Sequence, residues 1–368
     1  MNSNHLKVAG LIATIVILLV AVIVAGCSTQ QASTSPVKET PVSSPATKTI
    51  TDLADRTVEI PGNVTRVACL VGPSYEKVFM LGQMDKIALR TGMKRPWALL
   101  VNPDLEKIPT TSSAQDPNVE DLMEKNVQVV FFWDYPLPIQ KMTDRGITVV
   151  CTQSTRNVPD TIEGFIEFEK KEVQLFGEVL GPAAMHKADE YCTYFDEKVQ
   201  YVTSRVAKIP AAERPNVYYV RGPDALTTHG RNSYTQHWVE MAGGIMVSRD
   251  TEMEGLQQVS LEQVLNWNPD VIFMGRLAST DAVMNDPRWS SVKAVKDGRV
   301  YVNPDGVMYW DYSSEGVLLM MFIAKTLHPD IFEDLDLVKE VKEFYSRFYG
   351  YELTDDQANR LLKRLPPV

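Results

Sequence analysis

Arginine and aromatic residues follow the predicted strands in both halves of the sequence. In an open α/β sheet, ligands bind beyond the carboxyl ends of the strands. Aromatic rings offer a large flat contact surface, and guanidinium groups offer forked donors to carboxylate or phosphate. This mixture predicts a site for a bulky, partly anionic chelate. The candidate residues are Tyr75, Arg95, Trp97, Trp133, Asp134 and Tyr135 in the first half, and Arg221, Arg231, Tyr234, Arg276, Tyr309 and Trp310 in the second.

The motifs of common catalytic and metal sites are absent from the sequence. There is no G-x-S-x-G elbow, no H-E-x-x-H, no G-K-[ST] phosphate loop and no cysteine pair with zinc spacing. None of the five histidines lies between residues 50 and 168. His229 and His237 could contact a ligand, but surface or packing roles are the simpler interpretation. We therefore expect no enzymatic activity, no cofactor and no resident metal ion.

Short apolar runs alternate with helical periodicity, which indicates parallel α/β sheets. Strands are predicted at residues 66–71, 127–133 and 147–151, and again at 216–220, 271–274 and 299–302. Residues 118–132 align without gaps on residues 260–274. Each of these two segments has a helix N-cap, a short helix, a turn and a buried strand. The sequence thus predicts two similar Rossmann-like lobes with a ligand cleft between them.

A helical region joins the two predicted lobes. From Met185 to Val206, apolar residues recur at steps of three and four, which predicts one helix of about 23 residues and about 35 Å. Such a helix would act as a stiff spine. The predicted boundaries are an N-terminal lobe at 50–168, the helical region at 169–208, and a C-terminal lobe with its own C-terminal helices at 209–368.

The N-terminus predicts export and attachment to a membrane. After Lys7, residues 8–26 are apolar apart from Thr14, which is typical of a secretion signal and nearly long enough, at ~20 residues, to span a bilayer. Residues 1–26 are therefore interpreted as a signal peptide or a membrane anchor. Residues 27–49 are rich in Ser, Thr, Pro and Gln and are interpreted as a flexible linker.

Of the four cysteines, Cys27 directly follows the apolar N-terminal run, and the other three lie further along the chain. Val24-Ala25-Gly26-Cys27 resembles the lipobox of prokaryotic lipoproteins, in which the cysteine carries lipid; an uncleaved anchor is the alternative. Both interpretations place the later residues outside the cytoplasm, anchored to the outer face of the cell membrane. Cys69 and Cys151 lie in predicted strands and are interpreted as buried thiols, with a disulfide between them as the alternative.

Together these features resemble the class III substrate-binding lipoproteins of ABC importers, which serve iron–siderophore, haem and cobalamin uptake. The resemblance covers about residues 50–362 and rests on the order and spacing of motifs that are weak singly. They are Ile50–Pro61, Arg66–Glu76, the repeated helix-strand segments, Ala242–Gly244, Asp286–Trp289, Ala294–Tyr301, Trp310–Phe332 and Phe344–Leu362. The sequence departs from the family at Tyr75, because members commonly have threonine before the glutamate that follows.

The resemblance implies a permease dimer and its ATPase as partners. It assigns Glu120 and Glu262, which are equivalent in the internal repeat, to docking on arginine pockets of the permease. A glutamate in the first turn would also complement the helix dipole, and both roles can hold at once. A nucleic-acid partner is not expected, because the net charge of -10 offers no basic face.

The expected function is capture of a metal chelate of the iron–siderophore type and its delivery to the importer. Cobalamin or another corrinoid, and then haem, are the alternatives. An oxyanion such as molybdate is less favoured, because the cleft candidates are rich in aromatic residues. Two other classes stay open, namely a ligand sensor and a metallocluster oxidoreductase on the same scaffold.

Overall fold

The computed structural model describes residues 46–93, 95–153 and 159–368. The predictions for residues 1–45, including the signal or anchor, most of the linker and Cys27, lie outside the described residues. Residues 47–49, which the composition assigns to the linker, belong instead to strand β1 (Thr47–Thr51). This strand pairs antiparallel with β2 (Thr57–Pro61). Within the described ranges, no helix combines the length and apolar character needed to cross a membrane.

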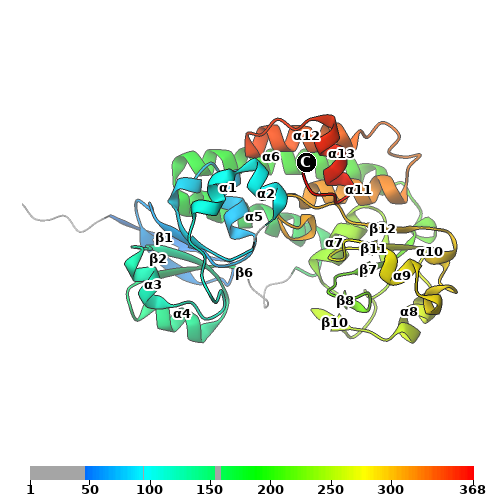
Figure 1. The fold of residues 1–368 in the computed structure, drawn as a ribbon, viewed down its shortest axis with the longest axis horizontal. Coiled ribbons are helices and arrows are strands. Elements are labelled where there is room, and N and C mark those ends of the chain that lie inside the picture. The colour runs from blue at the N-terminus through cyan, green and yellow to red at the C-terminus, as the bar shows by residue number, and fades with distance from the viewer. Residues whose placement is uncertain (1–45, 94, 154–158) are drawn as a thin grey trace, which may run out of the picture. The chain divides into compact units, whose positions relative to one another are not determined.

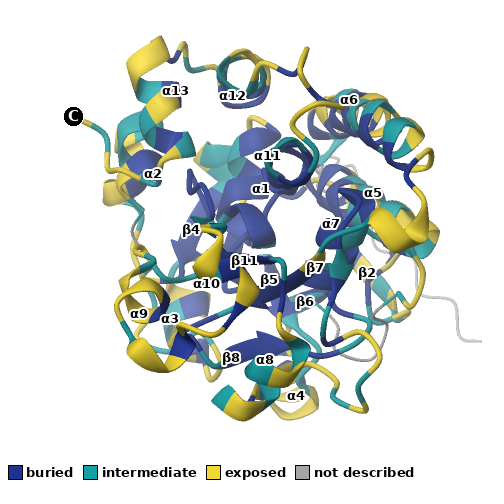
Figure 2. Cartoon of the chain, turned by 90° about the vertical axis from the view of Figure 1, so that its right-hand side faces the viewer, coloured by how far each residue is buried: buried dark blue, intermediate teal, exposed yellow. Residues whose placement is uncertain are grey.

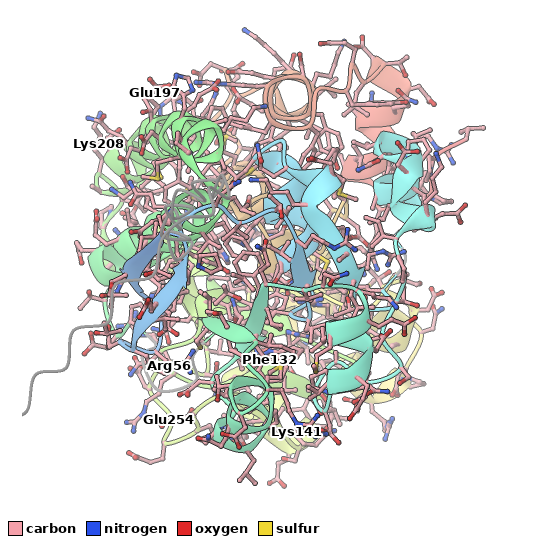
Figure 3. All side chains as sticks on the ribbon, turned by 90° about the vertical axis from the view of Figure 1, so that its left-hand side faces the viewer. Arg56, Phe132, Lys141, Glu197, Lys208 and Glu254 are labelled. Carbon is pink, nitrogen blue, oxygen red and sulfur yellow. The ribbon has the colours of Figure 1, made fainter. Side chains whose placement is uncertain are left out.

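The first lobe is built on a parallel sheet with strand order β4-β3-β5-β6. Its strands are β3 (Val67–Cys69), β4 (Ile87–Arg90), β5 (Val129–Trp133) and β6 (Thr148–Gln153), and its helices are α1 (Ser74–Met80), α2 (Pro96–Val101), α3 (Val119–Glu124) and α4 (Pro136–Thr143). Phe132 of β5 is fully buried, whereas Lys141 of α4 is exposed (Figure 3). The predicted apolar runs therefore form the interior of a covered sheet, as parallel sheets require.

The second lobe repeats the design with a parallel sheet in the order β12-β11-β7-β9. Its strands are β7 (Asn216–Val220), β9 (Ile245–Met246), β11 (Val271–Met274) and β12 (Val300–Val302), with a separate antiparallel pair of β8 (Thr227–His229) and β10 (Leu256–Gln258). The helices are α7 (Tyr234–Met241), α8 (Leu261–Trp267), α9 (Asp281–Met284), α10 (Lys293–Lys296) and α11 (Gly316–Leu327). Strands β7 and β11 are buried (Figure 2). The predicted two-lobed α/β class is confirmed.

The internal repeat extends to the backbone conformation. Asn118 caps α3 and Ser260 caps α8, each with a side-chain oxygen that accepts a backbone N–H. At the turn between helix and strand, the aligned residues Asn126 and Asn268 are both left-handed, with φ of 51° and 43°. Asparagine tolerates that conformation better than most residues. The sequence alignment therefore identified a shared structural unit.

The spine between the lobes is a pair of helices. α5 (Ile162–Leu180) and α6 (Pro182–Val206) are joined at Gly181 and pack along one another (Figure 1). α6 has the predicted place and a length of 25 residues. The predicted helical region starts too late, however, because α5 already begins before residue 169. The pair makes a broader connection than a single helix.

The C-terminal segment packs against α11 of the second lobe and also reaches the first lobe, a contact that the predicted domain boundaries did not include. It comprises α12 (Leu337–Phe344), a π-helical turn (Tyr345–Tyr349) and α13 (Asp355–Leu362). The rings of Phe79 in α1 and Tyr349 stack with centroids 5.3 Å apart. The indole N–H of Trp97 donates to the carbonyl of Leu365 at 3.0 Å. Amphipathic periodicity predicted these helices but not their contacts with the first lobe.

Two buried glutamates join this segment to both lobes. Glu315 is 0% exposed, and its carboxylate accepts hydrogen bonds from the Tyr345 hydroxyl at 2.7 Å and from the Met308 N–H at 2.9 Å. Glu76 of α1 accepts from the Tyr349 hydroxyl at 2.7 Å. Burial raises the pKa of Glu315 to about 8. Buried acids of this kind are tolerated only where donors surround them.

We predict that Glu315→Ala destabilises the protein by about 3–5 kcal/mol, because it leaves several buried donors without an acceptor. Urea unfolding followed by circular dichroism measures the change. Glu333→Ala is the matched control, since Glu333 is exposed and should change the free energy of unfolding by less than about 0.5 kcal/mol. A loss below about 1 kcal/mol in Glu315→Ala would contradict the structural role of the network.

Candidate functional site

A cavity of about 90 Å³ lies between the lobes, beyond the carboxyl ends of strands β3 and β6. Ligands of open α/β sheets bind at such edges. Residues of the first lobe, of α5 and of the second lobe all contribute to its wall. They are Pro73, Lys77, Gln153, Pro159, Phe165, Phe168, Glu169, Glu172, Tyr234, Trp238, Asp311, Tyr312 and Ser313. The wall therefore combines aromatic rings with charged groups of both signs.

Two arginines stand at one edge of the second sheet, beside this cavity. Arg221 directly follows β7 and Arg276 comes shortly after β11; these strands are neighbours, with Val220 opposite Met274. The Nε–H of Arg221 donates to the Tyr234 hydroxyl at 2.7 Å. No hydrogen bond to the described residues engages its two terminal nitrogens. Arg221 therefore keeps a forked pair of donors for a ligand.

The electrostatic surroundings keep Arg221 charged. Burial opposes the positive charge, but the nearby Tyr234 and Asp311 raise the pKa of Arg221 above its ordinary value. The next residue, Gly222, has φ of +81°, and a Cβ there would lie 2.7 Å from the Cβ of Arg276. Only glycine suits this left-handed, crowded position. It lets the chain after Arg221 run close against Arg276.

Tyr309 connects arginines from the two lobes. The guanidinium carbon of Arg95, from the first lobe, lies 4.1 Å from the ring centroid of Tyr309, and that of Arg276 lies 3.7 Å from it. Arg95 also forms an ion pair with Asp305 of the second lobe. Such cation–π contacts strengthen when the cation is desolvated. The stack is therefore an interlobe contact made by residues that the sequence analysis selected for ligand binding.

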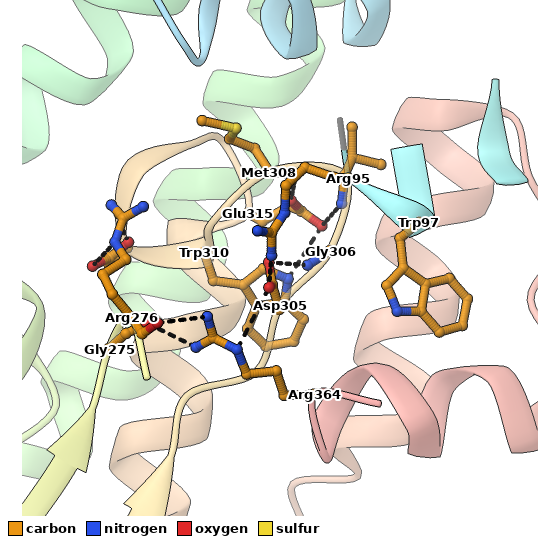
Figure 4. A network of polar contacts seen from close by, with 12 residues as sticks. Arg95, Trp97, Gly275, Arg276, Asp305, Gly306, Met308, Trp310, Glu315 and Arg364 are labelled. Carbon is orange, nitrogen blue, oxygen red and sulfur yellow. Dashed lines mark hydrogen bonds and ion pairs between the residues drawn. The ribbon is translucent and has the colours of Figure 1, made fainter. Parts of the chain in front are cut away.

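A fourth arginine completes the cluster. The Nη1–H of Arg364, after α13, donates to the carbonyl of Gly275 at 2.8 Å, and its Nε lies 3.6 Å from a carboxylate oxygen of Asp305 (Figure 4). Burial lowers the pKa values of both Arg95 and Arg364. The cost of desolvating these guanidinium groups is offset by the carbonyl and carboxylate partners around them.

The arginine cluster has more positive than negative charge. Arg276 forms an ion pair with Asp311 at 2.8 Å, and Asp305 serves Arg95 and Arg364. Arg221 adds a further cation that faces no carboxylate within ion-pair distance among the described residues. Four guanidinium groups thus share two carboxylates. A local excess of positive charge exists in a chain whose net charge is -10, and it suits an anion.

The predicted aromatic segment after β5 is in place at the strand end. The rings of Trp133 and Tyr135 stack with centroids 5.8 Å apart and an interplanar angle of 18°. The backbone N–H of Asp134 donates to the carbonyl of Gln153 at 3.1 Å. All three side chains are half-buried. Across the cavity, the rings of Tyr234 and Tyr312 lie 5.8 Å apart.

Three aromatic candidates are packing residues instead. Tyr75, Trp97 and Trp310 are at most 3% exposed. The Tyr75 hydroxyl donates to the carbonyl of Val307 at 2.6 Å, and Trp97 donates to Leu365 in the C-terminal segment. The Trp310 indole donates to the buried Glu315. No hydrogen bond or ion pair joins Trp97 to the other residues drawn in Figure 4. Because their polar atoms are already bonded within the protein, we assign these residues to the core and the lobe contact.

The other candidates near the second lobe also have protein partners. Arg231 lies at the surface and forms an ion pair with Glu254 at 2.8 Å. His229 is buried, with Nδ1 3.0 Å from the Thr235 hydroxyl, and burial together with Arg221 lowers its pKa to about 3. Burial also lowers the pKa of His237. Both histidines are therefore neutral packing residues, as the simpler interpretation predicted.

Sequence reasoning missed several charged residues of the site. Asp305 lies shortly after β12, so the rule used for the other strands could have found it. Asp311 and Lys77 have no such signal, because they belong to a turn and to a helix. Arg364 reaches the site only because the C-terminal segment folds back.

The described thiols and carboxylates outside the arginine cluster offer no set of metal ligands and no disulfide. Within the described residues, no group of three His, Cys, Asp or Glu could hold a metal ion. Cys69, Cys151 and Cys192 are free and buried, so the alternative of a disulfide is wrong. Burial raises the pKa values of the Cys151 and Cys192 thiols to about 12.

The two glutamates assigned to docking are exposed at equivalent places. Glu120 lies in the first turn of α3 and Glu262 in the first turn of α8. One carboxylate oxygen of Glu120 is 3.9 Å from Arg145, at the limit of an ion pair. Both side chains are thus placed where an outside partner can reach them.

A family model described as periplasmic binding protein matches residues 67–306. The chain belongs to this family. It is similar to the molybdate-binding protein MolA of Haemophilus influenzae, with 28% identity over 339 residues that cover 86% of this chain and 94% of MolA. The solved structure of MolA bound to molybdate has a TM-score of 0.75, with 27% identity over 83% of this chain and 99% of that chain.

Two further similarities bear on the comparison. A periplasmic solute binding protein from Veillonella parvula has a TM-score of 0.71, with 28% identity over 86% of this chain and 97% of that one. The Fe(3+)-citrate-binding protein YfmC of Bacillus subtilis is 24% identical over 300 residues, 78% of this chain and 86% of YfmC. The expected class III binding protein of an ABC importer is confirmed, and so is its extracytoplasmic type.

Proposed function

We propose that this binding protein captures a small oxyanion of the molybdate class between its lobes and delivers it to an ABC importer. The observation that carries the proposal is Arg221, which holds two unengaged donors at a cluster with excess positive charge. A guanidinium fork matches two oxygens of a tetrahedral anion. The similarity to MolA over most of both chains supports the same ligand class.

The site also argues against the bulky chelate favoured by the sequence. Tyr75, Trp97 and Trp310 contribute to packing, so the aromatic surface left for a large flat ligand is smaller than the sequence suggests. The cavity of about 90 Å³ is small. Opening it further would require the lobes to separate, against the contacts that Arg95 makes with Tyr309 and Asp305.

A ferric carboxylate chelate is the second candidate. It is favoured by the stacked rings of Trp133 and Tyr135 at the first-lobe edge and by the similarity to the Fe(3+)-citrate-binding protein. Arginines would serve its carboxylates as they serve an oxyanion. The two candidates differ in size, and the titration below separates them.

We further propose that the protein acts by binding alone and is held at the outer face of the membrane through lipid on Cys27. The packing of His229 and His237 and the burial of Cys69, Cys151 and Cys192 support a protein that acts by binding alone. The resemblance of residues 24–27 to a lipobox supports the anchor. A retained N-terminal helix is the alternative anchor.

We predict that Arg221→Met weakens molybdate binding at least about 100-fold, or ~2.7 kcal/mol at ~1.4 kcal/mol per tenfold. Isothermal titration with molybdate, sulfate, ferric citrate, a ferric siderophore, cobalamin and haem measures affinity and selectivity. Arg231→Met is the matched control and should bind like the wild type, because Arg231 pairs with Glu254 at the surface. Tight binding of only the chelates by the wild type would contradict the oxyanion proposal.

Reversing both docking charges, Glu120→Lys with Glu262→Lys, should abolish uptake in cells while ligand affinity stays unchanged. The physical reason is repulsion between lysines and the arginine pockets expected on the permease. Glu124→Lys with Glu197→Lys is the control for a general charge effect, since both residues are exposed (Glu197, Figure 3). Normal uptake by the first double variant would remove the docking role.

Mass spectrometry of the protein from native membranes should show an N-terminal Cys27 that carries a diacylglyceryl modification. Cys27→Ser should release the protein from the membrane or leave it as an unprocessed precursor. An unmodified chain that still begins at residue 1 would favour the helical anchor instead.

A further inference from the structure

The wall of the cavity formed by α1 and α5 has more acids than bases. Lys77 is its ammonium group, and it forms an ion pair with Glu172 at 3.1 Å. Glu172 also accepts a hydrogen bond from the amide of Gln153 at 3.2 Å. Glu76 and Glu169 lie close enough to Lys77 to raise its pKa further. Three carboxylates thus lie near the single ammonium group of Lys77, and Glu172 is the one that forms an ion pair with it.

Glu169 differs from the other two acids. Glu76 has hydroxyl donors and Glu172 has Lys77 and Gln153. Glu169 lines the cavity, yet no hydrogen bond to it exists among the described residues. Aromatic rings share the wall around it, including Phe165, Phe168 and Tyr312. Because these aromatic surroundings give Glu169 no hydrogen bond from the described residues, they disfavour the ionised form of its carboxyl group.

We infer that Glu169 shares one proton with an oxygen of the bound anion, and that capture takes this proton from solution wherever Glu169 is ionised before the anion binds. This rests on the proposed function. The side chain opens into the same cavity as Asp311 and Tyr234, which contact Arg276 and Arg221. An anion that reaches from the arginines past Tyr234 and Asp311 into this cavity would present an oxygen to the wall that holds Glu169. An O–H between the two oxygens would turn repulsion into a hydrogen bond.

The charges that face Glu169 from neighbouring elements agree with this assignment. From α5 itself comes Glu172, from α1 come Glu76 and Lys77, and from α6 comes the Tyr191 hydroxyl. Asp311 lines the same cavity from the turn before α11. Burial and Glu172 raise the pKa of Glu169 to about 8, while Lys77 lowers it. A bound anion would add a further negative charge and raise it more. Below pH 8 the proton is already present; above it, binding must take the proton up.

The test is isothermal titration of the wild type with sodium molybdate at pH 7 and pH 9, in buffers of different ionisation enthalpy. Proton uptake should be small at pH 7 and approach one per anion at pH 9, where affinity should fall about tenfold per pH unit. Glu169→Gln keeps an amide donor and should bind with no proton uptake at either pH. Glu167→Gln is the control on the same helix, because Glu167 is exposed and pairs with Lys170.

Equal proton uptake by Glu169→Gln and the wild type would overturn the inference while the oxyanion function stands. Wild-type binding without uptake at pH 9 would do the same. If the wild type binds no anion, the proposed function fails instead. The carboxyl ¹³C signal that Glu169→Gln removes is a separate measurement on the free protein. A titration midpoint near 8 is expected, and a midpoint at the ordinary value of about 4.3 would overturn the inference even if the anion binds.

Discussion

The crowding of four guanidinium groups near Asp305, Asp311 and Tyr309, beside the cavity, is the constraint on which the site depends. Like charges repel strongly in a poorly solvated space, and each buried charge needs partners. Asp305, Asp311, the carbonyl of Gly275 and the ring of Tyr309 meet that need for three of the arginines. Among the residues that the structure describes, Tyr234 alone forms a hydrogen bond with Arg221, through Nε. The donors of the cluster that remain available to a ligand are therefore the terminal N–H groups of Arg221.

The same partners make the cluster a contact between lobes. Arg95 belongs to the first lobe, but its ring and carboxylate partners belong to the second. The C-terminal segment adds Arg364 to the cluster and packs its aromatic residues on α1. Beneath it, Glu315 and Glu76 bind hydroxyls of the π-helical turn. The rigidity supplied by these buried bonds fixes the geometry in which the arginines face the cavity.

Much of this architecture could be predicted because it depends on short sequence patterns. Strands, N-caps and the internal repeat depend on neighbouring residues, so the alignment of Asn126 on Asn268 even anticipated equal backbone conformations. The rule that ligands meet strand ends found Arg221, Arg276 and the segment after β5. It failed where the residues that surround a candidate are far from it in the sequence. Trp97 is an example, since Leu365 takes its indole N–H. Arg364 is the converse case, because its role depends wholly on where the C-terminal segment folds.

The proposed site sets an arginine cluster beside a cavity whose wall is acidic, and this opposition would explain how the site selects its anion. Arginines alone would attract any anion of suitable size. The carboxylates of α1 and α5 outnumber the one ammonium group of Lys77. They therefore repel a fully ionised ligand oxygen and weaken its binding. An anion that can share a proton with Glu169 avoids that repulsion, and an anion whose oxygens are too weakly basic cannot. Selectivity would then follow from the basicity of the ligand oxygens. Neither the arginines alone nor the carboxylates alone would distinguish anions by this property.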